Sequence, residues 1–215
     1  MLPATPNITL GEPFIELASI DSTNIYAMNL VHNGLASSGS CYRAHYQTQG
    51  KGQHGRIWES SAGLNLLCSY VLELKQLKTD KIWTPSDQIG FSAAVALGVH
   101  SFFEGYAGAA TKIKKPNDIY WGDRKAGGIL IENLVRGAAW TWTVVGIGIN
   151  INQIEFSNEG AHPISLKQIT HQDFDLSSLQ KQLTASLKKA LLNWLEKGEV
   201  ATLQKMEALC VDIKK

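Results

Sequence analysis

The amino-acid sequence predicts one mixed domain of the α/β or α+β class. Strand-like segments dominate the middle of the chain, and helical patterns dominate its C-terminal part. The chain has 215 residues, of which 44% are apolar, which is enough for one substantial core or two small ones. At ~150 residues per domain, the length corresponds to roughly 1.4 domains. Because no internal repeat, low-complexity tract or clear linker divides the sequence, a single domain is the simpler interpretation.

The N-terminal part predicts three strands with a helix between the first two. Phe14–Ile20 is typical of a short strand. Asp21-Ser22-Thr23 then offers N-cap oxygens to a helix with apolar residues at helical spacing, which Asn33-Gly34 ends. Ser40–Gln47 is the second strand and Asn65–Leu74 the third.

The central part predicts a helix followed by two short strands. Pro85-Ser86-Asp87 opens the helix, which runs to about Phe103 through small and apolar residues. The strands are expected at Lys112–Lys114 and Ile119–Trp121. A turn is expected to follow them at Gly122–Lys125.

Two further strands and two helices complete the pattern. Gly128–Val135 leaves the turn as a strand. Ala139–Ile151 alternates at first and is then continuously apolar, as in a buried central strand. A long amphipathic helix is expected at Leu176–Glu196 and a short one at Val200–Ala208.

The composition excludes several classes of function. With 20 basic and 19 acidic side chains the formal charge is +1, which excludes electrostatically driven nucleic-acid binding. The cysteines Cys41, Cys68 and Cys210 form no C-x-x-C pair, so neither a disulfide framework nor a cysteine zinc site is expected. The six histidines form no ligand cluster, and we assign no metal site. Because neither a secretory signal nor an apolar run of about 18 residues is present, we expect a cytoplasmic protein without a membrane segment.

The glycine-rich segment Gly50–Gly55 is the first candidate for chemistry. It matches G-x-G-x-x-G, but a dinucleotide fold requires a helix to begin within the motif. Here a loop and then a strand follow, so we reject the Rossmann interpretation. Backbone amides together with Lys51, His54 and Arg56 could bind phosphate or carboxylate, and a solvated hairpin tip is the alternative.

Three other segments have both a functional and a structural interpretation. Lys114–Asp118 could hold a ligand, although turn formation is the simpler explanation of its Pro, Asn and Asp. Lys125 stands close to two glycines, where it could approach an anion or be an exposed turn lysine. Gly146–Asn152 places glycines inside an apolar strand, which indicates the close approach of either a ligand or a packed helix.

Taken together and in order, these segments resemble the catalytic domain of the biotin–protein ligases over about residues 14–195. The resemblance rests on Ser22-Thr23-Asn24, on Gln47 with Gly50-Lys51-Gly52, Gly55-Arg56 and Trp58, on Gly63, Asn65-Leu66 and Ser69, on Lys114 with Pro116-Asn117-Asp118, on Lys125 with Gly128-Ile129-Leu130 and Glu132, and on Gly146, Gly148 and Asn150. A series of motifs in the right order is hard to obtain by chance.

The resemblance implies an α+β fold, a mixed sheet flanked by helices, related to class II aminoacyl-tRNA synthetases and lipoate ligases. It also implies a two-step reaction. The biotin carboxylate attacks the α-phosphate of ATP, giving biotinyl-5′-AMP and pyrophosphate, and a lysine of a biotin carboxyl carrier protein then attacks this anhydride and releases AMP. ATP and Mg²⁺ are the implied cofactors and biotin the substrate. A homodimer is compatible with it, and neither nucleic acid nor membrane is an implied partner.

The same resemblance implies the roles of particular residues. The catalytic residues would be Lys125, Lys51 and Arg56. Biotin would be bound by Ser22, Thr23, Asn24, Gln47, Gly50, Lys51, Gly52, Gln53, Lys125 and Gly128. The nucleotide would be bound by Arg56, Trp58, Asn117, Asp118 and Asn150.

Two departures from the family's usual motifs concern the nucleotide. The family often has several arginines in the glycine-rich loop, whereas this chain has Lys51, Gln53 and His54, which predicts a weaker grip on phosphate. Lys115 stands where the family commonly has tryptophan, which puts an aromatic contact there in doubt.

The implied domains are an N-terminal extension at 1–13, the catalytic domain at 14–198 and a C-terminal helix and tail at 199–215. The chain ends too early for the small SH3-like domain of many relatives, and no helix-turn-helix precedes residue 14, so we expect neither. Two alternatives remain open. One is a lipoate–protein ligase, whose Arg-Arg-x-Ser-Gly-Gly-Gly run is missing from this sequence, and the other is a non-catalytic module that binds biotin or nucleotide.

Overall fold

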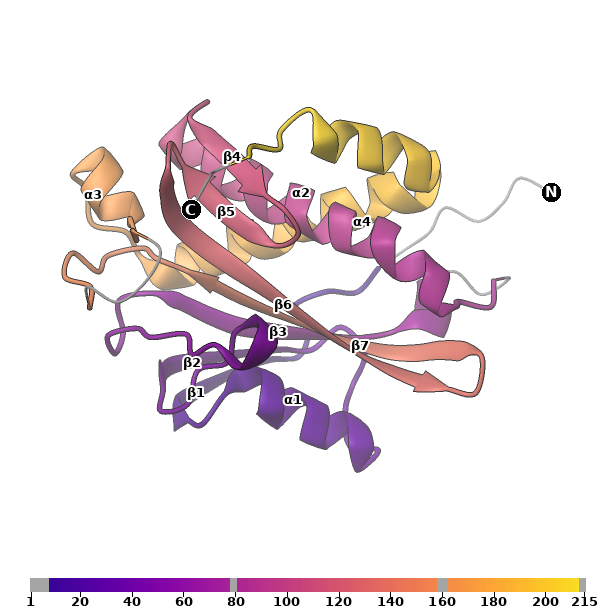
Figure 1. Ribbon diagram of the computed structural model, residues 1–215. Helices are drawn as coiled ribbons and strands as arrows, with labels where there is room; N and C mark the ends of the chain where they lie inside the picture. The colour runs from indigo at the N-terminus through magenta and orange to yellow at the C-terminus, as the bar shows by residue number, and fades with distance from the viewer. Residues whose placement is uncertain (1–7, 78–80, 158–161, 213–215) are drawn as a thin grey trace.

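The computed structural model describes residues 8–77, 81–157 and 162–212, and within them seven strands form one sheet (Figure 1). The strands are β1 (Phe14–Ile20), β2 (Cys41–Gln47), β3 (Leu66–Glu73), β4 (Thr111–Lys114), β5 (Asp118–Trp121), β6 (Arg124–Arg136) and β7 (Ala139–Ile149). Their order across the sheet is β1-β2-β3-β7-β6-β5-β4. Only β1 and β2 pair in parallel; every other neighbouring pair among these strands is antiparallel, so the sheet is mixed.

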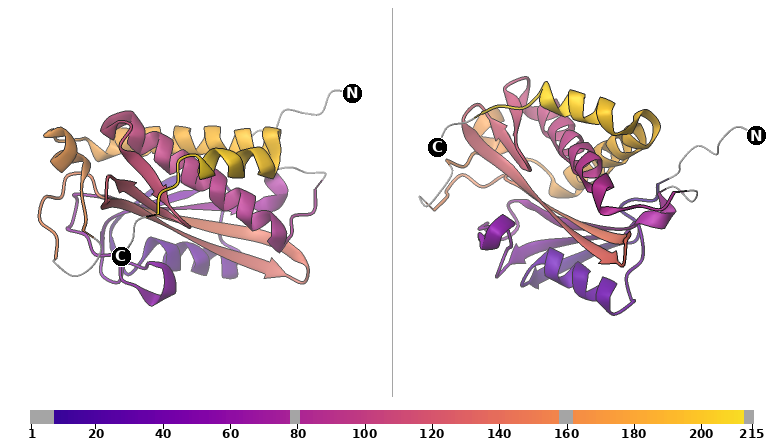
Figure 2. Two further views of the ribbon diagram at one scale, coloured as in Figure 1. Left: turned by 45° about the horizontal axis from the view of Figure 1, so that its top comes forward. Right: turned by 45° about the vertical axis from the view of Figure 1, so that its right-hand side comes forward.

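Helices cover both faces of the sheet. They are α1 (Thr23–His32), α2 (Gln88–Ala107), α3 (Leu166–Thr170) and α4 (Leu176–Glu207), with short 3₁₀ turns η1 (Gln53–Gly55), η2 (Leu74–Gln76) and η3 (Pro85–Asp87). Helices α2 and α4 lie together over one face, and α1 lies on the opposite face (Figures 1 and 2). Among the described residues, no helix is both long and apolar enough to cross a membrane.

Alternation along the strands divides the interior into a large core and a small one. Cys68, Ile129 and Ile147 belong to the large core beneath α2 and α4. Val71 and Val144 belong to the small core beneath α1. Successive side chains of a strand point to opposite faces, so every second residue of a strand faces α1. Helix α1 is short and covers only part of this face, so other segments of the chain can pack against the rest of it.

The close packing of α2 against α4 explains the small residues of α2. At Gly98 a Cβ atom would lie 3.0 Å from the Leu187 Cα, so the two helix backbones approach closely. The rings of Phe91 and Trp194 meet edge to face, with centroids 5.7 Å apart. Burying side chains of this size contributes ~1.5–3 kcal/mol each, so this face of the sheet supplies much of the stability.

All seven predicted strands are confirmed, but the turn expected at Gly122–Lys125 is wrong in its extent. Only Gly122 and Asp123 form the turn, and β6 begins at Arg124. Lys125 is therefore a strand residue rather than an exposed turn lysine. The strand begins directly after the two-residue turn because Arg124 and Lys125 pair with Trp121 and Tyr120 of β5. Pro163, distant in sequence, also pairs with Lys125.

The helical predictions hold with adjusted boundaries. The helix opened by Pro85 continues to Ala107 rather than Phe103. The two helices expected at 176–196 and 200–208 form the single element α4, interrupted at Gly198, where φ is 80°. Such a left-handed conformation is easily adopted only by glycine. Helix α3 has only five residues and was not predicted from the sequence.

Both ends of the described chain are tied to the fold. Residues 1–7 of the expected N-terminal extension lie outside the described residues, but Ile8 and Leu10 are buried in the large core. At the other end, Ile113 N donates to Leu209 O (3.0 Å) and Val211 N donates to Ile113 O (3.0 Å). The C-terminal segment thus pairs with the outer edge of β4.

Candidate active site

The first turn of α1 places buried polar side chains on the sheet. Thr23 N and Thr23 Oγ1 both donate to Gln47 Oε1, at 2.8 and 3.0 Å. Ser69 Oγ, on β3, lies 2.8 Å from Thr23 Oγ1 and 2.6 Å from Asn24 Oδ1. Ser22 is the N-cap of α1, but its hydroxyl makes no capping hydrogen bond. These side chains are hydrogen-bonded to one another, as buried polar groups normally are. Their polar atoms are therefore already oriented for a polar ligand group.

Glu132 of β6 joins this cluster to the glycine-rich loop. Asn24 Nδ2 donates to Glu132 Oε2 (2.9 Å) and to Leu130 O (3.3 Å). Lys51 Nζ donates to Glu132 Oε1 (2.6 Å). One carboxylate therefore contacts both α1 and the loop.

The glycine-rich loop folds as a narrow hairpin against the sheet. Gly52 N donates to Arg56 O (2.7 Å) and Trp58 N donates to Gly50 O (2.8 Å). A Cβ at Gly50 would lie 2.2 Å from Trp58 O, so only glycine fits at this position. Inside the hairpin the only helical structure is η1, with His54 at φ 55°, and no helix begins there. The rejection of the Rossmann interpretation is thereby confirmed.

Trp58 lies over two glycines that face each other across β6 and β7. Gly128 and Gly148 are register partners. A Cβ would lie 3.2 Å from the indole at Gly128 and 2.5 Å from it at Gly148. Gly146, two residues along β7, has Asn24 of α1 above it, where a Cβ would lie 2.2 Å from Asn24 Oδ1. The glycines of β7 therefore accommodate a packed helix at one position and a loop indole at the next.

Lys125 and Asp118 form an ion pair beside Trp58. Lys125 Nζ lies 2.7 Å from Asp118 Oδ1 and 5.9 Å from the centroid of the Trp58 ring. Both side chains are about one fifth exposed, at 23% and 20%. Burial, and secondarily the charge of Asp118, raises the pKa of Tyr120, so this phenol remains neutral next to the pair. The site thus holds a fixed cation within reach of solvent.

The two candidate nucleotide-binding asparagines use their amides to hold the backbone. Asn117 Nδ2 donates to Ile129 O (2.5 Å). Asn150 Nδ2 lies 3.4 Å from Lys125 O and 3.3 Å from Ile164 O. Both contacts fix the strand that carries Lys125, so the geometry supports a positioning role for these asparagines; their contact with a nucleotide stays a prediction.

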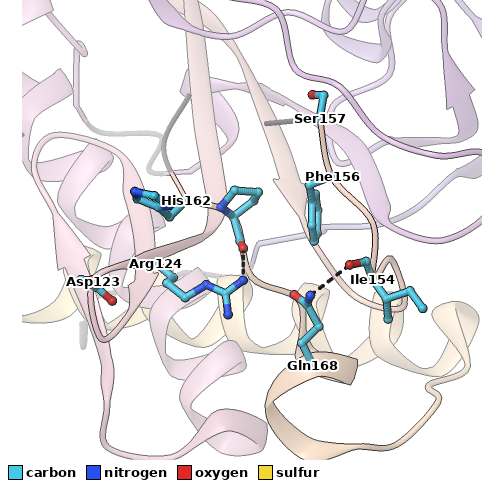
Figure 3. A pocket seen from close by; sticks show the side chains of 8 residues that line it. Asp123, Arg124, Ile154, Phe156, Ser157, His162 and Gln168 are labelled. Atoms are coloured by element: carbon cyan, nitrogen blue, oxygen red, sulfur yellow. Dashed lines mark hydrogen bonds between the residues drawn. The ribbon is translucent and has the colours of Figure 1, made fainter. Parts of the chain in front are cut away.

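A pocket lies beside the first residues of this strand (Figure 3). It has a volume of about 480 Å³. Its lining residues are Asp123, Arg124, Ile154, Phe156, Ser157, His162, Pro163 and Gln168. Since Arg124 and Lys125 are consecutive in β6, their side chains point to opposite faces. Arg124 donates from Nη2 to Pro163 O (2.6 Å), so within this pocket it braces the segment that pairs with Lys125.

Most of the predicted site residues therefore fall into two groups. The polar group contains Ser22, Thr23, Asn24, Gln47, Gly50 and Lys51. The second group contains Trp58, Asn117, Asp118, Lys125 and Gly128. Gly52 and Gln53 lie in the hairpin, and Arg56 is exposed there. No cluster of three potential metal ligands occurs within residues 8–77, 81–157 and 162–212.

Sequence reasoning assigned no role to Glu132 or Ser69. The sequence did contain a signal for Glu132. Gly128, Leu130 and Glu132 are alternate residues of one strand and therefore lie on the same face of it. A charged side chain on this face, between the apolar Leu130 and Leu134, indicates a specific partner.

Comparison with known proteins gives the family. A model of the biotin/lipoate A/B protein ligase family matches residues 16–150. The bifunctional ligase/repressor BirA of Escherichia coli K12 is 31% identical over 195 residues, which make up 90% of this chain and 58% of that protein. The biotin–[acetyl-CoA-carboxylase] ligase of Paracoccus denitrificans is 35% identical over 135 residues, 63% of this chain and 53% of that protein. The chain thus spans somewhat more than half the length of these relatives.

The fold agrees with that of a solved relative. The biotin protein ligase of Aquifex aeolicus, determined in complex with biotin and ATP, matches with a TM-score of 0.76 and 26% identity, covering 93% of this chain and 79% of that one. The expectation of a mixed sheet flanked by helices is confirmed by this similarity and by the sheet itself. The chain belongs to the biotin/lipoate A/B protein ligase family and has the catalytic-domain fold of the biotin protein ligases.

Proposed function

We propose that this chain is an ATP-dependent ligase that converts biotin to biotinyl-5′-AMP and transfers the biotinyl group to a lysine of a biotin carboxyl carrier protein. The observation that carries the proposal is that a polar cluster and a fixed lysine lie on the same face of the sheet. Asp118 Oδ1 and Lys125 Cε would lie 3.4 and 3.6 Å from a Cβ at Gly128, which points to the α1 face. Family membership supports the same reaction.

The polar cluster suits the ureido ring of biotin. A ureido group presents two N–H donors and one carbonyl acceptor in a small apolar body. Thr23, Asn24 and Ser69 offer hydroxyl and amide groups already oriented by mutual hydrogen bonds. A few oriented polar groups in an apolar pocket are what small-molecule recognition needs. The available Ser22 hydroxyl adds a further donor.

Lys125 suits the activation step. An ammonium group has three donors, and here Asp118 takes one. The remaining two are proposed to donate to the biotin carboxylate and the α-phosphate, which both bring negative charge. A cation that is already positioned stabilises the charge that develops as the carboxylate oxygen bonds to phosphorus and pyrophosphate leaves.

Transfer then requires little more from the chain. The amine of the acceptor lysine attacks the acyl carbon of the mixed anhydride, and the bond to AMP breaks. Lys125 would stabilise the departing phosphate charge as it did in the first step. Arg56, exposed in the glycine-rich hairpin, is proposed as a further phosphate contact.

Mg²⁺ is expected with ATP, and the donor set fits it. Mg²⁺ usually keeps several waters and is held by one or two carboxylates together with substrate phosphates. Asp118 is the carboxylate beside Lys125 and would be the protein ligand of the Mg²⁺ ion. When bound, the ion would neutralise phosphate charge.

The catalytic domain is proposed to span residues 14–198, as the sequence suggests. Segments outside these limits contribute to the same fold, since Met206 and Leu209 pack against the large core. The proposed macromolecular partner is a biotin carboxyl carrier protein that presents its lysine to the α1 face.

The experiment measures biotin-dependent ATP–pyrophosphate exchange and then biotinylation of a carrier domain. Exchange with biotin, followed by a biotin adduct on the carrier lysine, is the expected result. Exchange with lipoate in place of biotin would assign the chain to the lipoate branch of the family. Binding of biotin or ATP without exchange would overturn the catalytic proposal in favour of a binding module.

A further inference from the structure

We propose that Glu132 is the positioning residue that holds the glycine-rich hairpin, residues 50–58, over the biotin end of the site, and that it acts through Lys51. This inference rests on the proposed function. It assigns to Lys51 a role as the attachment point of the hairpin and not as a cation at the phosphate.

Glu132 has two partners, one for each oxygen. Lys51 Nζ lies 2.6 Å from Oε1, and Asn24 Nδ2 lies 2.9 Å from Oε2. The Lys51 side chain is 41% exposed and that of Glu132 is 27% exposed. A partly exposed ion pair contributes little to global stability, so its effect is expected on the position of the hairpin.

The location of Glu132 separates Lys51 from the reacting groups. Gly128, which Lys125 and Asp118 adjoin, lies four residues earlier in β6. Four residues of extended strand span about 13 Å. While its ammonium remains on Glu132, Lys51 therefore lies at the end of the site occupied by Asn24 and away from the Lys125–Asp118 pair.

The Glu132 carboxylate also determines how Asn24 is presented. Asn24 donates its amide N–H to Glu132 and accepts from Ser69 Oγ at its oxygen, so the amide is held in one orientation. Ser69 is in turn 2.8 Å from Thr23 Oγ1, and Thr23 donates to Gln47. Closure of the hairpin and orientation of the polar cluster thus share one group, Glu132.

Two consequences follow for ligand binding. Loss of the Glu132 charge should release the hairpin and weaken biotin binding, while a nucleotide bound near Lys125 should be affected much less. Loss of the Lys51 amine should weaken biotin binding to the same extent as loss of the Glu132 charge, because each change breaks the contact between Lys51 and Glu132.

The test compares E132Q, K51M and the double variant with wild type by calorimetric titration of biotin and by the KM for ATP in pyrophosphate exchange. The side-chain amide introduced by E132Q would retain an oxygen for Asn24, and methionine keeps an unbranched chain at position 51. D173N serves as the matched control, because Lys167 Nζ lies 2.6 Å from Asp173 Oδ1 in an ion pair outside both groups of site residues. K51M changes an exposed loop residue, so it keeps the test valid if E132Q fails to fold.

Each single variant should bind biotin about fivefold more weakly, the scale of a partly exposed ion pair, with the KM for ATP unchanged. The double variant should bind within twofold of either single one. Salt should weaken biotin binding more in wild type than in the variants, because the contact of the biotin carboxylate with Lys125 is present in all of them. Unchanged biotin affinity in K51M, effects that multiply in the double variant, or a raised KM for ATP in K51M would each overturn the proposal.

The hairpin is also measured without ligand, which separates this inference from the proposed function. Trypsin should cleave after Arg56 several-fold faster in E132Q than in wild type or D173N. If wild type shows no exchange but E132Q is still cleaved faster, the proposed function fails while the attachment of the hairpin stands. Equal cleavage rates in an active enzyme would overturn the attachment alone.

Discussion

Lys125 Nζ lies 2.7 Å from Asp118 Oδ1, and the two residues stand on neighbouring strands of the β5–β6 hairpin. The pair fixes the lysine before any substrate arrives. Its backbone is fixed as well, since Lys125 N donates to His162 O (2.8 Å) and Ile164 N donates to Lys125 O (2.9 Å). A preorganised cation needs no rearrangement when negative charge develops beside it.

Replacing Lys125 with alanine should abolish most adenylation while the protein stays folded. One positioned donor at developing charge is typically worth ~3 kcal/mol, or roughly a hundredfold in rate. The measurement is biotin-dependent pyrophosphate exchange, with circular dichroism to show that the sheet is intact. Lys167→Ala is the control for loss of a partly exposed lysine elsewhere. Exchange within threefold of wild type would remove Lys125 from the mechanism.

Strand alternation and turn residues were enough to predict the strands but not their order in the sheet, because each strand is defined by local sequence and the order is not. All seven strands were expected, but Lys125 was expected in a turn. The turn has two residues rather than four, so Lys125 pairs with Tyr120 of β5, and it also pairs with Pro163, about forty residues further along. No local pattern reports the second pairing. Similarly, Gly198 breaks α4 without ending it, because the helix is stabilised by packing on both sides of the break.

The site was predicted as a set of residues but not as an arrangement. Thr23 and Gln47 were both assigned to biotin, and they contact each other directly. The family resemblance could not show that Asn150 uses its amide on the backbone or that Lys51 bonds to Glu132. Those contacts depend on side-chain positions set by tertiary packing.

Removing residues 209–215 should loosen the β4–β5 hairpin that carries Asp118. The C-terminal segment supplies two backbone hydrogen bonds to Ile113 and packs Leu209 against the core, and losing a half-buried side chain costs about 1–2 kcal/mol. Amide exchange at Ile113 should become much faster, and pyrophosphate exchange should fall with it. Glu207→Gln, which breaks only the exposed contact with Lys115, is the control and should leave both unchanged. Slow exchange at Ile113 in the truncated chain would contradict this role.

The stability should decline as the pH falls below about 6.5, in part through His100. Burial lowers the pKa of this imidazole, against a hydrogen bond to Thr111 O and the charge of Glu104, which raise it. As the pH falls, His100 therefore takes up a proton first in the unfolded state, at about pH 6.5. Its contribution to the free energy of unfolding is fully present above that pH and is lost as the pH falls towards the pKa of His100 in the folded state. Urea denaturation at pH 7.5, 6.5 and 5.5 measures the loss, which should be smaller in His100→Gln. If the free energy of unfolding falls equally with pH in wild type and in His100→Gln, His100 contributes nothing to the loss of stability.

Replacing Gly148 with alanine should displace Trp58 and weaken the adenylate complex. The new methyl group would lie 2.5 Å from the indole, too close for contact without movement, whereas alanine at Gly105 meets no atom within 4 Å and serves as the control. Overpacking costs ~1–3 kcal/mol, so release of biotinyl-AMP should accelerate roughly tenfold. In a Trp58→Ala background the same change should have no further effect, because the indole that it strikes is gone. The measurement is release of preformed biotinyl-AMP by filter binding from wild type, Gly148→Ala, Gly105→Ala, Trp58→Ala and the double variant. If Gly148→Ala releases the adenylate as slowly as wild type, or accelerates release equally with and without the indole, then Trp58 does not cover the nucleotide side of the site.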